Sequence, residues 1–100
     1  MKLLLVVNPI SGGKDKEIFI NKAEAYCKKY GIAYEYFHTT GEDDVKKLAS
    51  AVDKVAPDRV VSIGGDGTTL MTALALQHSS VPFGIIPMGS ANGMAKELIA

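Results

Sequence analysis

The fold of this chain is decided by the stretch RVVSIGGDGT at residues 59–68. Its first five residues, Arg59–Ile63, are rich in β-branched side chains and predict a strand. The strand leads directly into a loop with three glycines, and helix-forming residues return at Leu70–Leu76. A strand that passes through such a loop into a helix is typical of the β-α-β unit, whose strands are parallel. The stretch therefore predicts an α/β fold.

The flanking parts of the chain repeat this order. Leu3–Val7 is a continuous apolar run, which predicts a strand buried on both faces of a sheet. From Asp15 to Tyr30 apolar residues recur every three or four positions, which predicts a helix that ends at Gly31. Pro82 introduces another predicted strand at Phe83–Ile86.

A further strand and helix are expected in between. Ile32–Phe37 is aromatic and β-branched enough to form a strand. Thr40 and Asp43 approximate a capping box, which predicts a helix that begins there and stops at Pro57. Its apolar stripe comprises Val45, Leu48, Ala49, Val52 and Val55.

The predicted order of elements is β-α-β-α-β-α-β-α. With right-handed crossovers, this order places helices on both faces of a parallel sheet, as a Rossmann-like three-layer α/β/α fold. Residues 1–100 should form one domain. Its last helix would start after Pro87–Gly93, and Ala100 would lie only about two turns into it. We therefore expect the chain to be truncated.

Composition argues against several classes of protein. Eleven basic residues balance eleven acidic ones, so nucleic acid is not an expected partner. The apolar run at Leu3–Val7 is too short for a signal peptide, and no stretch approaches the ~20 apolar residues of a membrane span. Cys27 is the single cysteine and cannot form an internal disulfide. We expect a cytoplasmic protein.

Three glycine-bearing loops each follow a predicted strand and precede a predicted helix: Asn8–Gly13, Gly64–Thr68 and Met88–Gly93. In a parallel sheet all three lie at the carboxyl edge, where ligands of open α/β folds bind. Bare backbone N–H groups at a helix start can bind phosphate oxygens. Turn geometry and capping explain any one loop equally well, but three loops on one edge favour a shared phosphate ligand.

Two common nucleotide-binding motifs are absent from the first loop. The sequence NPISGG at residues 8–13 does not match G-x-G-x-x-G. Gly13-Lys14 is followed by Asp15, where a Walker A loop needs Ser or Thr.

The three loops instead resemble the diacylglycerol kinase catalytic-domain family, which includes bacterial lipid kinases and the sphingosine and ceramide kinases. The matching motifs are Asn-Pro-x-Ser-Gly at 8–12, Gly-Gly-Asp-Gly-Thr at 64–68 and Gly-Ser-x-Asn-x-x-Ala at 89–95. NAD kinases and phosphofructokinases carry loops similar to the second motif. The three motifs in this order favour the lipid-kinase family.

The resemblance implies an ATP-dependent kinase that transfers the γ-phosphoryl group to a hydroxyl of a lipid or lipid-like alcohol, with Mg²⁺ as a cofactor. A C-terminal β domain, absent here, would bind the acceptor, so residues 1–100 alone would be nearly inactive. Peripheral contact with the inner membrane face is expected, and homodimerisation is left open. The implied ATP-binding residues are Asn8, Pro9, Ser11, Gly12, Thr40, Gly64, Gly65, Asp66, Gly67, Thr68 and Ser90.

Asp66 is the single carboxylate in these loops. It could help hold Mg²⁺ or lie near the attacking hydroxyl, or it could cap the following helix. No residue is assigned as a metal ligand. Ser90, where many members have Thr, keeps the hydroxyl.

Two departures from the family put metal-linked contacts in question: Met71 stands where members often have Glu, and Gly93 where one branch has Asp. Two alternatives are an NAD kinase-like enzyme, which would share Gly64–Thr68, and a nucleotide-binding regulatory module without turnover.

Overall fold

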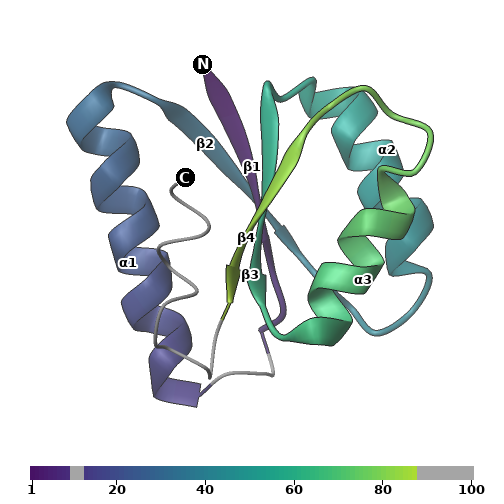
Figure 1. The fold of residues 1–100 in the computed structure, drawn as a ribbon, viewed down its shortest axis with the longest axis horizontal. Helices are drawn as coiled ribbons and strands as arrows, with labels where there is room; N and C mark the ends of the chain where they lie inside the picture. The colour runs from purple at the N-terminus through teal and green to yellow at the C-terminus, as the bar shows by residue number, and fades with distance from the viewer. Residues whose placement is uncertain (10–12, 88–100) are drawn as a thin grey trace.

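Four strands and three helices alternate along the residues described by the computed structural model, 1–9 and 13–87 (Figure 1). The predicted α/β fold with a parallel sheet is confirmed, and the helix predicted after Pro87 lies outside the described residues. The elements are β1 (Lys2–Val7), α1 (Gly13–Tyr30), β2 (Ala33–His38), α2 (Asp44–Val55), β3 (Arg59–Gly64), α3 (Asp66–Ala75) and β4 (Phe83–Pro87).

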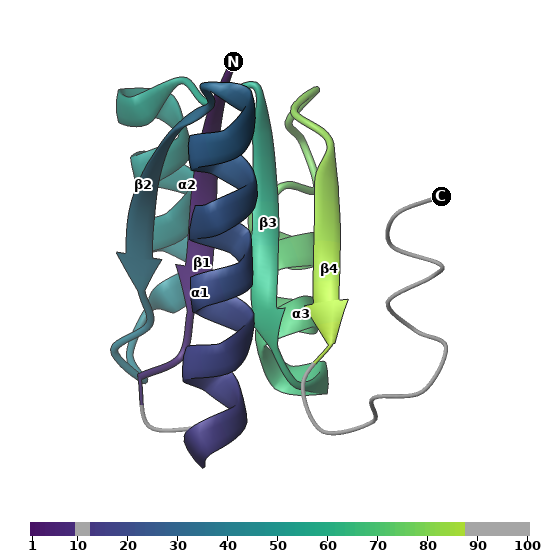
Figure 2. The ribbon, with the colours of Figure 1, turned by 90° about the vertical axis from the view of Figure 1, so that its left-hand side faces the viewer.

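The strands are arranged in the order β2-β1-β3-β4, and every pair is parallel. Val7 at the end of β1 lies opposite His38 of β2 and Ile63 of β3, so these strands end together. All four strands point the same way in Figure 2, which brings the loops after them to one edge of the sheet. The connection through α1 leads from β1 outward to β2, and the connection through α2 leads from β2 back past β1 to β3. The topology therefore switches direction between β1 and β3.

Two apolar cores lie on the two faces of the sheet, one beneath α1 and the other beneath α2 and α3 (Figure 1). The successive side chains of β1 alternate between them, so the prediction of a strand buried on both faces is confirmed. No helix within the described ranges is long and apolar enough to cross a membrane. The buried residues are Leu3, Leu5, Val7, Cys27 and Ile63 beneath α1, and Leu4, Val6, Leu48, Val52, Val60 and Leu76 on the opposite face.

The start of α2 differs from the prediction. The residue that precedes the helix is Asp43, in the left-handed conformation with φ of 52°, and its side chain makes no capping hydrogen bond. Thr40 is therefore not the N-cap, because residues 39–43 form a separate turn before the helix begins. Val45, predicted to lie in the apolar stripe, is 36% exposed because it lies in the first helical turn at the rim of the core. Leu48 and Val52 are buried as predicted.

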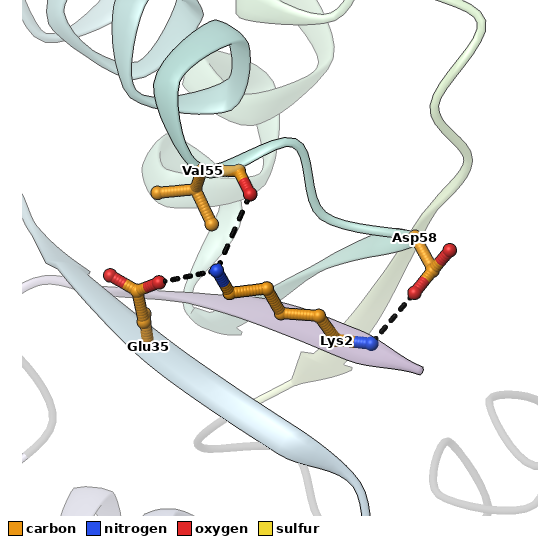
Figure 3. Close-up of polar contacts among 4 residues, drawn as sticks. All are labelled: Lys2, Glu35, Val55 and Asp58. Carbon is orange, nitrogen blue, oxygen red and sulfur yellow. Dashed lines mark hydrogen bonds and ion pairs between the residues drawn. The ribbon is translucent and has the colours of Figure 1, made fainter.

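Lys2 holds the opposite, amino edge of the sheet together (Figure 3). Its ammonium group lies 2.8 Å from a carboxylate oxygen of Glu35 on β2 and donates to the carbonyl of Val55 at the end of α2. Its backbone N–H donates to Asp58 Oδ2 at 2.7 Å, and the Asp58 N–H donates back to the Lys2 carbonyl at 2.8 Å. One residue thus joins β1 to β2, to the end of α2 and to the connection into β3.

Candidate functional site

A cleft of about 220 Å³ opens at the carboxyl edge of the sheet, where the loops after β1, β2 and β3 meet. This is the switch point of the topology, at which open α/β sheets bind ligands. Each of the three loops, together with the first turns of α2 and α3, contributes to the wall. The residues that line the cleft are Asn8, Thr39, Asp44, Gly65, Gly67, Thr68 and Met71.

Gly64 is required by the packing of α3 against β3. It is buried at the end of the strand, and a Cβ atom in its place would lie 2.8 Å from Thr68 Oγ1 and 3.0 Å from Thr68 Cβ. Such distances are shorter than side-chain packing allows. Glycine at position 64 therefore lets the first turn of α3 lie close to the strand, with Thr68 buried against it.

Gly65 and Gly67 have no comparable role within the described residues. A Cβ atom at either position would meet no atom within 4 Å. The backbone at Gly65 is extended, with φ of −88° and ψ of −166°, which any residue can adopt. A glycine inside a helix, as at Gly67, destabilises by roughly 0.5–1 kcal/mol relative to alanine. Both positions line the cleft, so the missing side chains leave room there for a ligand.

The start of α3 has no side-chain cap. Gly65 is the N-cap residue and Asp66 is the first residue of the helix, so the alternative prediction that Asp66 caps α3 is wrong. Within the described residues, the exposed Asp66 side chain makes no hydrogen bond or ion pair, and it does not line the cleft. The first N–H groups of a helix have no partner inside the helix, and they carry the positive end of its dipole. The start of α3 can therefore bind an anion.

The turn before α2 is closed by its own hydrogen bonds. The Asp44 carboxylate accepts from the backbone N–H of Thr40 at 2.8 Å, the Thr40 hydroxyl at 3.0 Å and the backbone N–H of Gly41 at 2.9 Å. The pKa of Asp44 is lowered mainly by the hydrogen bond from the Thr40 backbone N–H. The Gly41 N–H, the Thr40 hydroxyl and the charge of Lys47 lower it further. Lys47 Nζ also donates to Thr40 Oγ1 at 3.0 Å. Thr40 is exposed, and the side of the turn that lines the cleft consists of Thr39 and Asp44.

Of the residues predicted to bind ATP, four line the cleft: Asn8, Gly65, Gly67 and Thr68. Pro9 is exposed directly after Asn8. Ser11, Gly12 and Ser90 lie outside the described residues. Their binding roles stay predictions, as do those of Thr40, Gly64 and Asp66.

Three further residues line the cleft without having been predicted as site residues: Thr39, Asp44 and Met71. The strand register could have indicated Thr39, because β2 extends to His38 and its next residue lies beside the end of β1. Met71 also packs against the core beneath α2 and α3, as expected for a residue that fills a gap.

No group of three or more His, Cys, Asp or Glu side chains in residues 1–9 and 13–87 could hold a metal ion. Asp44 is the carboxylate in the cleft wall, and both of its oxygens already accept hydrogen bonds from the turn. The requirement for Mg²⁺ stays a prediction.

Comparisons with known proteins agree on one family. Residues 2–100 match the family described as the diacylglycerol kinase catalytic domain. The chain is 34% identical to Sphingoid long-chain bases kinase 1 from Arabidopsis thaliana, across 93% of this chain and 13% of that protein. It is 31% identical to a diacylglycerol kinase from Mycobacterium tuberculosis, across 96% of this chain and 31% of that protein.

A solved structure of a diacylglycerol kinase from Bacillus anthracis superimposes with a TM-score of 0.65 at 28% identity, covering 95% of this chain and 35% of that one. The chain thus spans about a third or less of the length of these three proteins.

Proposed function

The chain belongs to the diacylglycerol kinase catalytic domain family of lipid kinases, and we propose that its cleft binds the phosphates of ATP. The phosphoryl acceptor would be a hydroxyl of a lipid or lipid-like alcohol, bound outside the described residues. The observation that carries the proposal is the pair Gly65 and Gly67. Their missing side chains serve no packing purpose in the described fold, and both lie in the cleft wall at the start of α3.

The dimensions and charge of the cleft favour a phosphate ligand held by the backbone. At about 220 Å³ the cleft is smaller than the ~300–1,000 Å³ typical of pockets that enclose a whole small molecule. Among the described residues that line it, none is Lys or Arg. The described residues would attract phosphate through the backbone N–H groups and the dipole of α3, at roughly 0.3–1 kcal/mol for each favourable charge near the helix start. Phosphoryl transfer depends mainly on such positioning and electrostatic stabilisation.

ATP titration followed by calorimetry and thermal shift tests this proposal, with the variant Gly65→Val. The valine side chain would project into the space that the phosphates need, so ATP affinity should fall by at least about tenfold, or roughly 1.4 kcal/mol. Gly84→Val is a matched control. A Cβ atom at Gly84 also meets no atom of the described residues within 4 Å, and this residue lies within β4, away from the cleft lining. The proposal fails if the protein does not bind ATP, or if Gly65→Val binds it as tightly as the unmodified protein.

Binding without phosphate transfer is a second candidate function. Met71 contributes an uncharged thioether to the cleft, and no metal cluster exists within the described ranges. An assay that follows labelled γ-phosphate from ATP to diacylglycerol or a sphingoid base separates the two functions. Saturable ATP binding with no labelled lipid would favour the non-catalytic module.

A further inference from the structure

The Asp44 carboxylate is the centre of the turn that separates β2 from α2. One oxygen, Oδ1, accepts from both the backbone N–H and the hydroxyl of Thr40, and the other, Oδ2, accepts from the N–H of Gly41. None of these donors belongs to α2 itself. Asp44 thus lies at a helix start, where its charge is favourable, but its hydrogen bonds stabilise the turn rather than the helix.

The same turn forms one wall of the cleft. The Thr39 N–H donates to the carbonyl of Val7 at 2.9 Å, which attaches the turn to the end of β1, directly before Asn8. Thr39 and Asp44 line the cleft together with the glycines of the α3 start. Any movement of residues 39–44 would therefore change the shape of the space that we assign to phosphate.

The backbone of this turn needs such fixing. Gly41 has φ of 89° and Asp43 has φ of 52°, so two of its residues lie in the left-handed region. The left-handed conformation is strained for residues other than glycine, which disfavours the turn in the absence of compensating bonds. Lys47 adds a bond from the first turns of α2 to Thr40 Oγ1.

We propose that Asp44 is a positioning residue for the ATP site, which holds Thr39 and the rest of the turn as a fixed wall of the phosphate cleft without itself binding phosphate. This inference rests on the proposed function. Without Asp44 the turn would sample other conformations, and the affinity for ATP would fall in proportion to the fraction of molecules in which the wall remains formed.

The test compares ATP affinity, measured by calorimetry, in the variants Asp44→Ala and Asp44→Asn. If the wall is formed in one tenth of Asp44→Ala molecules, the dissociation constant rises about tenfold. Asparagine keeps one acceptor oxygen, so Asp44→Asn should recover part of the affinity. Amide hydrogen exchange at Thr40 and Gly41 should be fastest in Asp44→Ala and intermediate in Asp44→Asn, because these two N–H groups lose their hydrogen bonds to the carboxylate.

Two controls separate positioning from general effects. Glu42→Gln removes a charge from an exposed side chain in the same turn, and no side-chain hydrogen bond or ion pair of Glu42 exists among the described residues. Val52→Ala lowers global stability from the core face of α2 without touching the turn. Under conditions in which every variant is folded, both controls should bind ATP within about twofold of the unmodified protein, because the Glu42 side chain makes none of the bonds that hold the turn and Val52 lies in the core away from it.

The outcomes distinguish the two proposals. Unchanged ATP affinity in Asp44→Ala, or an equal loss in Val52→Ala, overturns the positioning role while the ATP site stands. No ATP binding by the unmodified protein overturns the proposed function, and the role of Asp44 with it.

Discussion

The helices α2 and α3 both begin at the carboxyl edge of the sheet with an aspartate as their first residue, yet the two aspartates have different environments. Asp44 accepts three hydrogen bonds from the turn that precedes its helix. Asp66 is exposed and has no such partner within the described residues. Residue type and helical position are the same, so neither explains the difference.

The length of the preceding connection does explain it. Residues 39–43 connect β2 to α2, which is enough chain to fold back and place N–H groups on Asp44. Gly65 alone connects β3 to α3, so no backbone is available to reach Asp66. A long connection satisfies its own polar groups, whereas a one-residue connection leaves the helix start to an outside ligand.

The largest effect that would sharpen this comparison is expected from Gly64→Ala. The added Cβ would press against Thr68, and overpacking of this kind destabilises by about 1–3 kcal/mol. Gly65→Ala, one residue later in open space, should change the free energy of unfolding by less than about 1 kcal/mol. Urea denaturation of both variants measures the difference. Equal stability of the two would mean that α3 does not lie as close to β3 as described.

A pH-dependent effect is expected at Asp44. The pKa of Asp44 is lowered in the folded state, mainly by the backbone N–H of Thr40, so its charge stabilises the fold above the unfolded pKa of about 3.9. That stabilisation disappears as the pH falls through the lower, folded pKa. Asp44→Asn should therefore be less stable than the unmodified protein by roughly 0.5–1.5 kcal/mol near pH 6, with the gap closing below about pH 4.

Asp66→Asn is the paired measurement for this effect. At pH 6 it should lower the free energy of unfolding by less than Asp44→Asn does, because the Asp66 side chain accepts no hydrogen bond from the described residues and loses only its favourable charge at the helix start. A loss at position 66 as large as that at position 44 would show that the two aspartates are equivalent after all.

The smallest effect is expected from Asp43→Gly. Glycine removes the strain of the left-handed conformation at φ of 52°, but it also loosens the unfolded chain, so a net gain of about 0.5 kcal/mol is expected. Ala56 ends α2 at nearly the same φ, 50°, and Ala56→Gly should gain more, about 1 kcal/mol, because alanine tolerates this region less than aspartate. Thermal unfolding of the two single variants ranks them, and a loss of stability in either contradicts the strain.

Local patterns in the sequence predicted most of the fold. The apolar run at Leu3–Val7 identifies a strand, and the stripe through Leu48 and Val52 identifies a helix. Both patterns of apolar residues are set by which side chains are buried. The start of α3 was less predictable. Helix formers are evident only from Leu70, whereas the helix begins at Asp66, since packing of Thr68 and Thr72 against the sheet outweighs the low helix propensity of Gly67.

The lining of the cleft was predicted where glycine-rich loops form it and missed where it depends on tertiary geometry. Gly65 and Gly67 are visible in the sequence because a glycine-rich loop between strand and helix is unusual. Asp44 became a wall residue because the chain folds back between His38 and the helix, and no local pattern encodes that path. Thr40 was assigned from the family resemblance, whereas Thr39 lines the cleft because β2 ends at His38, one residue later than predicted.

The position of Lys2 has a consequence for synthesis on the ribosome. Lys2 is translated well before its partners Glu35, Val55 and Asp58, and β1 is translated before both of its neighbours in the sheet. At about 5–20 residues per second, the nascent chain carries the unpaired apolar segment Leu3–Val7 for roughly 3–12 s before β3 has been made. Chaperones that recognise short apolar segments would therefore meet this chain at its first strand.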